Sequence, residues 1–185
     1  MIKVIVDGAK TKVMYDSEKR VYTKTFNPDT DKKLKYILGM RTYPGENFKK
    51  ISDFFNKNGI RTPKILEVGK FKIVTQELEG ILFRDELHSA ANERKLFLLD
   101  LYIEIVAKII NLGVYFGDFN FGNFIVSNND LWAIDLEDYR KDFFSSCRKK
   151  SLLKRLKRFL LNTKTDNLPM NGQEIYDKIL KKISS

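Results

Sequence analysis

The chain has 185 residues, enough for one substantial core or two small lobes, and 43% of them are hydrophobic, which is ordinary for a globular protein. A single cysteine, Cys147, excludes an internal disulfide and a cysteine-based zinc site, and a single histidine, His88, argues against a histidine metal site or a Ser-His triad. The formal net charge of +10 is concentrated, because residues 140–164 hold ten basic side chains and one acidic one.

The N-terminal part of the chain is predicted to be rich in strands. Residues 2–6, 12–15 and 20–26 are strand-like stretches separated by short polar turns, which predicts an antiparallel meander, and residues 59–66 and 70–76 predict two more strands. Residues 46–55 carry apolar side chains at helical spacing, and Gly59 is the predicted stop of this helix. The first residues lack the segments of a signal peptide, so together with the cysteine usage they predict a cytoplasmic protein.

The remainder is predicted to be mainly helical. Residues 96–112 are the longest apolar run, but Asp100, Glu104 and Lys108 recur every four residues and would form a polar stripe, as in a core helix rather than a membrane span. Gly113 is the predicted C-cap of this helix. Residues 148–160 predict a helix with leucines and a phenylalanine on one face and basic residues around the rest, and residues 172–183 predict a closing helix.

Between these helical segments lies a polar loop followed by a predicted β-hairpin. Residues 117–126 read GDFNFGNFIV, and after a Ser-Asn-Asn-Asp turn residues 131–135 read LWAID. Folding about the centre of this turn would place Asn123 opposite Asp135, where an amide oxygen and a carboxylate could share Mg²⁺ with phosphate oxygens. Asp118 lies five residues before Asn123, on the loop that leads into the hairpin.

This layout resembles the catalytic loop and metal-binding strand of the protein-kinase-like superfamily. The motifs GDFNFGNFIV and IDLED are most similar to those of small bacterial kinases of lipopolysaccharide core sugars, first the RfaY-type (RfaY/WaaY) heptose kinases and second the Kdo kinases. The resemblance implies an α+β, two-lobed kinase-like fold, with a β-rich N-lobe over residues 1–79 and a mainly helical C-lobe over residues 80–185. Phe116-Gly117-Asp118 and Asp135-Leu136-Glu137 depart from the His-Arg-Asp and Asp-Phe-Gly motifs of protein kinases, so activation-loop switching is not implied.

The resemblance also implies ATP and Mg²⁺ as cofactors and assigns roles to individual residues. Asp118 would orient the acceptor hydroxyl, and Asn123 and Asp135 would bind Mg²⁺. The implied nucleotide-binding residues are Gly8 in the turn over the phosphates, Lys24 as the phosphate-contacting lysine, Glu46 as its ion-pair partner, and Glu77 and Leu78 beside adenine. Ordinary alternatives remain for two of them: Lys24 as a solvated strand residue, and Glu46 as an acidic residue favoured in the first turn of a helix.

The predicted function is ATP-dependent phosphorylation of a heptose or Kdo sugar in the lipopolysaccharide inner core, with a lipid-linked core as the acceptor. The basic helix over 148–160 suits peripheral contact with the anionic cytoplasmic face of a bacterial inner membrane.

Other interpretations stay open. One is a small atypical protein kinase or ATPase of the tRNA-modification type, whose basic face would serve RNA. Another is a pseudokinase that binds nucleotide without turnover, and a third is a nucleic-acid-binding or membrane-docking module built around the basic helix. The plainest is that the lysines of this helix only face water. The preferred interpretation has no nucleic-acid partner and leaves the oligomeric state open.

Overall fold

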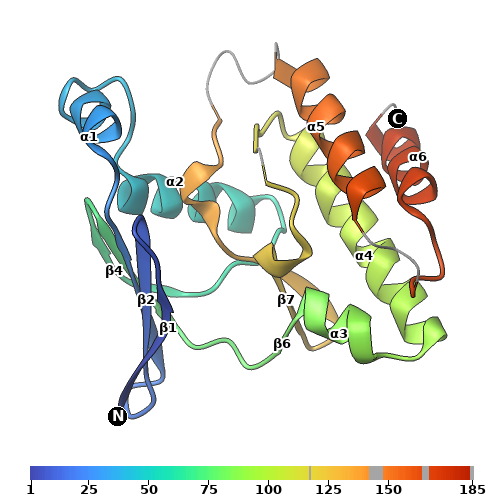
Figure 1. Ribbon diagram of the computed structural model, residues 1–185, viewed down its shortest axis with the longest axis horizontal. Coiled ribbons are helices and arrows are strands. Elements are labelled where there is room, and N and C mark those ends of the chain that lie inside the picture. Colours follow the sequence, from blue (N-terminus) through green and yellow to red (C-terminus); the bar gives the residue numbers. More distant parts are fainter. Residues whose placement is uncertain (117, 142–147, 164–166, 184–185) are drawn as a thin grey trace. The chain divides into compact units, whose positions relative to one another are not determined.

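The structure is a computed structural model that describes residues 1–116, 118–141, 148–163 and 167–183 (Figure 1). It divides into two compact units: unit 1 is Met1–Glu79 with Asp135–Asp138, and unit 2 is Gly80–Ile134 with Tyr139–Ser185. Helices and two antiparallel sheets make the chain an α+β protein, which confirms the predicted fold class. Gly117 of the loop motif and Cys147 lie outside the described residues.

Unit 1 is built on a five-stranded antiparallel sheet in the order β1-β2-β3-β5-β4. Its strands are β1 (Ile2–Asp7), β2 (Thr11–Asp16), β3 (Val21–Phe26), β4 (Ile65–Gly69) and β5 (Lys72–Gln76). The predicted meander of the first three strands is confirmed. The predicted strand over 59–66 is wrong for most of its length, because β4 begins only at Ile65, after Pro63, which has no N–H to donate to a ladder.

Two helices lie between β3 and β4 in the chain. The short α1 (Thr30–Ile37) was not predicted, although Asp29 caps it by accepting a hydrogen bond from the Lys32 N–H. The longer α2 (Pro44–Lys57) is the predicted helix and ends before Gly59, which has a φ of 67°. The first turn of α2 lies so close to the β4–β5 turn that a Cβ on Gly45 would stand 2.0 Å from the Gly69 carbonyl oxygen. A glycine is therefore required where α2 meets the sheet.

Unit 2 is mainly helical, and α6 packs against both α4 and α5 (Figure 1). Its helices are α3 (Phe83–Ser89), α4 (Asn92–Asn111), α5 (Lys149–Asn162) and α6 (Gly172–Ile183). The predicted polar stripe of α4 is exposed, and two of its members form ion pairs with α6, Asp100 with Lys178 at 3.3 Å and Glu104 with Lys182 at 2.5 Å. Among the described residues, no helix combines the length and the apolar character that a membrane crossing needs.

A second, three-stranded antiparallel sheet in unit 2 contains the predicted hairpin. It consists of β6 (Ile81–Leu82), β7 (Phe124–Ser127) and β8 (Asp130–Ala133), in that order. An aromatic cluster lies beside it, with ring centroids 4.9 to 6.4 Å apart, formed by Phe83, Tyr102, Phe121 and Phe124. These rings are buried, and they anchor the loop that precedes β7 to α4.

Candidate active site

Lys24 is the centre of a charge cluster in unit 1, and its own side chain is largely enclosed. It lies on β3, the middle strand of the sheet, and only 14% of its side chain is exposed. Its Nζ forms ion pairs with the carboxylates of Asp135 and Glu137, the latter at 2.6 Å. Burial alone would lower the pKa of Lys24, but the two carboxylates outweigh that effect and raise the pKa above its ordinary value. Lys24 is therefore a fixed cation rather than a solvated strand lysine.

Glu137 was not assigned a role from the sequence, yet it is the most enclosed carboxylate of this cluster. It lies in the short 3₁₀ helix η2 (Leu136–Asp138), which packs against α2, and the Asn47 amide donates a hydrogen bond of 2.8 Å to the Glu137 carbonyl oxygen. Its Oε1 faces Lys24, while its buried Oε2 has no hydrogen-bond partner within the described residues. Burial raises the pKa of Glu137, Lys24 opposes this shift, and Asp135 adds to it.

The predicted ion pair between Lys24 and Glu46 is not formed in this structure. Glu46 is exposed in the first turn of α2, and the acidic partners of Lys24 are Asp135 and Glu137. The cause is the register of α2. Gly45 faces the sheet, and the next residue of a helix points about 100° away from it. The sequence marks Glu137 as a partner of Lys24 only by its position two residues after Asp135.

Asp135 has an unusual backbone for a residue with a side chain. Its φ is 67°, in the left-handed region, which costs an L-residue roughly 1–2 kcal/mol. Its carboxylate is 46% exposed even though it is paired with Lys24, so one face of the group remains open to a ligand. Unfavourable backbone conformations of this kind concentrate where a side chain must be aimed at a site.

The other predicted nucleotide-binding residues lie in or beside the same sheet. Gly8 occupies the β1–β2 turn, where its N–H donates to the Thr11 carbonyl oxygen at 3.0 Å. The Glu77 carboxylate is used within the unit, because it accepts hydrogen bonds from Arg20 at 2.6 Å and from the Tyr15 hydroxyl at 2.8 Å. These partners lower the pKa of Glu77.

The backbone groups of Glu77 and Leu78 differ in their hydrogen bonding. The Glu77 N–H donates to the Arg20 carbonyl oxygen at 2.8 Å and so is not available to a base. The N–H and C=O of Leu78 have no hydrogen-bond partner in the described part of the chain. Of the two residues predicted to lie beside adenine, Leu78 is therefore the one whose N–H is open as well as its C=O.

In unit 2, the loop from Asp118 to Asn123 is held by its own hydrogen bonds. The Asp118 Oδ1 accepts from the Asn120 N–H at 3.0 Å, and the Asn120 Oδ1 accepts from the Gly122 N–H at 2.8 Å. The buried Tyr102 hydroxyl donates to the Phe119 carbonyl oxygen at 2.9 Å. Asp118 itself is exposed, so its carboxylate is oriented by the loop and accessible to a substrate.

The hairpin register differs by one residue from the predicted one. Phe124 faces Ala133, and the Ile134 N–H donates to the Asn123 carbonyl oxygen at 2.9 Å, so Asn123 faces Ile134 and not Asp135. The turn is centred between Asn128 and Asn129, both with left-handed backbones, which sets this pairing. Asp135 is the next residue along the chain.

The donor atoms in these segments suit magnesium. The described residues hold no cluster of three or more His, Cys, Asp or Glu side chains that could bind a metal ion. Carboxylate and amide oxygens, such as those of Asp135 in unit 1 and Asn123 in unit 2, are the hard oxygen ligands that Mg²⁺ prefers. The buried Asn123 fits this role, because its Nδ2 donates to the Asp118 carbonyl oxygen at 3.3 Å, which leaves its Oδ1 as an acceptor.

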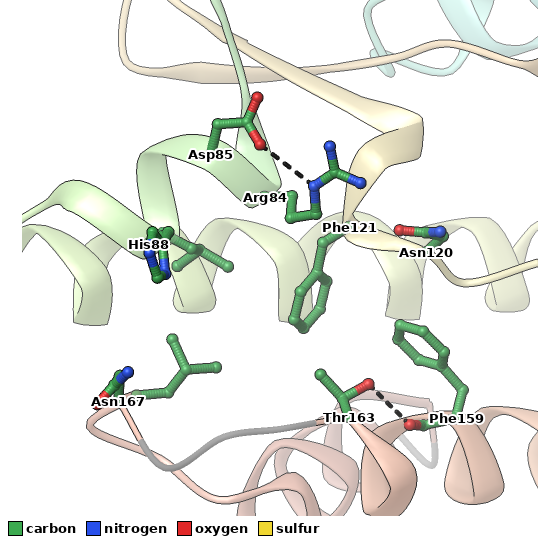
Figure 2. Close-up of a pocket in the computed structure, with 10 residues that line it drawn as sticks. Arg84, Asp85, His88, Asn120, Phe121, Phe159, Thr163 and Asn167 are labelled. Carbon is green, nitrogen blue, oxygen red and sulfur yellow. Dashed lines mark hydrogen bonds and ion pairs between the residues drawn. The ribbon is translucent and has the colours of Figure 1, made fainter.

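Two cavities in unit 2 adjoin this loop. The smaller has a volume of about 340 Å³ and is lined by Asp118, Phe119, Arg155, Arg158, Phe159, Asn162 and Thr163. The larger, of about 720 Å³, lies between the loop residues Asn120 and Phe121 on one side and Phe159 and Thr163 of the α5 end on the other (Figure 2). Phe159 and Thr163 line both cavities, so the two are neighbours.

Comparison with known proteins identifies the fold. The sequence matches no protein-family model and no curated protein. Among solved structures, WbdD bound to the kinase inhibitor LY294002 matches with a TM-score of 0.57 and 14% identity over 96% of this chain. The chain has a protein-kinase-like fold.

Two further kinase-like structures agree with this assignment. The streptomycin–ATP–APH(2″)-IIa ternary complex matches over 100% of this chain and 78% of its own, with a TM-score of 0.53 and 13% identity. The Rio2 kinase–ADP/Mg²⁺–phosphoaspartate complex from Chaetomium thermophilum matches over 98% and 68%, with a TM-score of 0.54 and 15% identity. The chain spans 44% of the length of WbdD. At these identities the likeness establishes the fold alone, and the resemblance to RfaY-type heptose kinases stays a prediction.

Proposed function

We propose that the protein is an ATP-dependent phosphotransferase that transfers a phosphoryl group to an alcohol. The observation that carries this proposal is the buried Lys24 on the central strand, paired with an Asp135 whose backbone is left-handed. A structural ion pair needs no such conformation. A lysine that contacts nucleotide phosphates and an aspartate that binds a cation must both be held in fixed positions. The reason is that phosphoryl transfer is catalysed mainly by positioning and charge neutralisation.

The proposed roles follow from what each side chain can do. Lys24 neutralises charge on the nucleotide phosphates, and Glu137 holds its ammonium group in place. Leu78 offers backbone groups to adenine. Asp135 and Asn123 hold Mg²⁺, which when bound neutralises charge on the phosphate oxygens. Asp118 accepts a hydrogen bond from the acceptor hydroxyl and aligns its oxygen for attack.

The finer proposal is that the acceptor is a sugar of the lipopolysaccharide inner core, heptose first and Kdo second. It rests on the resemblance of the loop and hairpin motifs to those kinases. In this proposal the lipid-linked core is presented at the cytoplasmic face of the inner membrane. The exposed basic residues of α5 would support peripheral contact with anionic lipid there.

The test is transfer of ³²P from labelled ATP to three acceptors: a purified heptose-containing core, a Kdo-only core and a generic protein. We expect labelling of the heptose-containing core. Asp118→Asn should lower that rate by about 100-fold or more while MgATP binding and thermal stability stay near wild type. Asp53→Asn, which alters an exposed carboxylate of α2, is the matched control. Turnover of Asp118→Asn within tenfold of wild type would remove Asp118 from catalysis.

A second candidate is a small atypical protein kinase or ATPase, favoured by the likeness to Rio2 kinase. The same assay separates the two candidates. Labelling of the protein substrate alone would support the second one. MgATP binding without labelling of any acceptor would instead indicate a pseudokinase.

A further inference from the structure

The cavity beside Asp118 is unusually basic for a site that must receive a substrate hydroxyl. Among the described residues that line it, the charged groups are one carboxylate, from Asp118, and two guanidinium groups, from Arg155 and Arg158 of α5. Its volume of about 340 Å³ is at the lower end of the range for small-molecule sites. The lining therefore combines the proposed acceptor-orienting group with an excess of positive charge.

The packing of α5 determines where these arginines lie. Leu152, Leu156 and Leu160 are buried on one face of the helix, which fixes its rotation. Arg155 and Arg158 are three residues apart, so they lie on the same side of the helix, and Asn162 follows one turn later. All three line the small cavity.

Within the described residues, neither guanidinium group is paired with an acidic side chain. Arg155 donates a hydrogen bond of 2.9 Å to the Tyr115 hydroxyl, which is an uncharged partner. Arg158 has no ion pair or hydrogen bond with any described residue. Both retain donors for a ligand, and guanidinium groups bind phosphate and carboxylate with two parallel hydrogen bonds.

Positive charge continues beyond the small cavity. A neighbouring hollow of about 640 Å³ shares Arg155, Arg158 and Asn162 with it and adds Lys154 and Lys157, and none of the described residues that line it is acidic. A cationic acceptor would be repelled along this approach. An anionic one would be attracted, and among the described lining residues Asp118 alone carries a charge that opposes it.

We propose that Arg155 and Arg158 bind an anionic group of the acceptor, a phosphate or a carboxylate, beside the hydroxyl that Asp118 orients. The acceptor is then an anionic sugar, either a sugar phosphate or a sugar acid, and this statement rests on the proposed phosphotransferase function. In the reaction, the acceptor oxygen forms a bond to the γ-phosphorus, and the bond from that phosphorus to the β–γ bridging oxygen breaks. The hydroxyl proton passes to Asp118, and ADP leaves with the bridging oxygen.

The test measures kcat/KM for three acceptors, namely neutral heptose, heptose phosphate and free Kdo, whose carboxylate represents the sugar acids. The variants are Arg155→Gln and Arg158→Gln, and the control is Lys181→Gln, an exposed lysine of α6 that lines none of these cavities. We expect each arginine variant to lose about tenfold or more on the better of the two anionic acceptors, because a charge-assisted hydrogen bond is removed. Activity on neutral heptose and the Kd for MgATP should stay within about twofold of wild type.

Two results would overturn the proposal: an equal loss on neutral and anionic acceptors, or no loss in either arginine variant. Preference for heptose phosphate over Kdo, or the reverse, identifies which anion is bound. Calorimetric titration with heptose phosphate in the absence of ATP separates this proposal from the proposed function. If binding that depends on Arg158 is found without any turnover, the phosphotransferase assignment fails and the anion site stands. If turnover of neutral heptose is found without such binding, the anion site fails and the phosphotransferase assignment stands.

Discussion

The side chain of Lys24 is positioned by ion pairs with Asp135 and Glu137, which follow the hairpin, and not by an acidic residue of α2. The Asn47 amide donates a hydrogen bond to the Glu137 backbone carbonyl oxygen, and the Glu137 side chain is largely enclosed. Glu137 can therefore hold the Lys24 ammonium group in one place. Glu46 is exposed and lacks an equivalent constraint. The ion pair predicted between Lys24 and Glu46 is therefore replaced by one between Lys24 and Glu137.

Glu137→Gln should consequently lower kcat/KM for phosphotransfer by about 10- to 100-fold, because a hydrogen bond to a charged group contributes roughly 1.5–3 kcal/mol. Glu46→Gln, which removes a carboxylate from α2, should stay within about twofold of wild type. A steady-state assay of ADP release on both variants compares them directly. A double-mutant cycle with Lys24→Met should be non-additive for Glu137 and additive for Glu46. The opposite pattern would restore the role to Glu46.

At the scale of elements, the loop that carries Asp118 depends on α4 through Tyr102. The Tyr102 hydroxyl donates to the Phe119 carbonyl oxygen, and its ring lies in the buried aromatic cluster. Burial, followed by the charges of Tyr139 and Asp118, raises the pKa of Tyr102 well above its ordinary value. The neutral phenol is therefore favoured in the folded state.

This pKa shift predicts a pH dependence of stability. A group whose pKa is raised by folding contributes stability below its unfolded pKa, about 10 for tyrosine, and loses it as the pH rises above that value. Tyr102→Phe should be destabilised by about 1 kcal/mol at neutral pH, and its deficit relative to wild type should shrink above about pH 10. Urea unfolding at a series of pH values measures the difference, with Tyr43→Phe as the control. A deficit that is constant up to pH 11 would contradict the assignment.

The contact between α2 and the sheet gives a second prediction at this scale. Gly45→Ala would force a Cβ against the backbone of the β4–β5 turn, so α2 must shift, at a cost of about 1–3 kcal/mol. Because α2 carries Asn47, MgATP binding should weaken as well. Gly69→Ala is the control, since its Cβ would make only ordinary contacts, the nearest at 3.6 Å. Equal unfolding free energies for the two variants, measured in urea, would exclude a tight contact at Gly45.

The sequence predicted the elements whose patterns are local. Helical periodicity and the glycines at 59 and 113 identified α2 and the end of α4, and alternating apolar runs identified the meander and the hairpin. The errors involve pairing and orientation, which depend on atoms far apart in the chain. The hairpin register was off by one residue, because the centre of the turn determines it, and β6 was missed, because two residues carry no periodicity. The pairing of Lys24 with Glu46 was wrong because the close approach at Gly45, which turns Glu46 away from the sheet, cannot be seen in the sequence.

At the scale of the whole molecule, the excess positive charge of the chain belongs largely to α5 and the residues before it. The leucine face of α5 is buried, so the helix has a structural role, while its lysines are exposed and available to an anionic surface. Each basic residue near such a surface contributes about 1 kcal/mol to membrane binding.

Charge reversal of α5 tests whether those lysines meet a membrane. Lys149→Glu, Lys150→Glu and Lys154→Glu combined should abolish co-sedimentation with vesicles that contain anionic phosphatidylglycerol, while MgATP binding persists. The matched control reverses Lys32, Lys33 and Lys35 on α1 and should leave vesicle binding largely intact. Unchanged vesicle binding by the α5 variant would mean that these lysines only face water. Loss of RNA binding instead would favour the second candidate function.

We propose that this kinase-like fold binds MgATP through Asp135, and isothermal titration calorimetry can measure that binding. The wild-type protein should bind ATP in the presence of Mg²⁺ and lose most of that affinity when EDTA removes the metal ion. Asp135→Ala should weaken MgATP binding by about 100-fold, since it removes a charged ligand that the nucleotide alone cannot replace. The control variant Asp53→Asn should bind as wild type does. Binding of MgATP by Asp135→Ala with wild-type affinity would contradict the account, and so would wild-type affinity that does not depend on Mg²⁺.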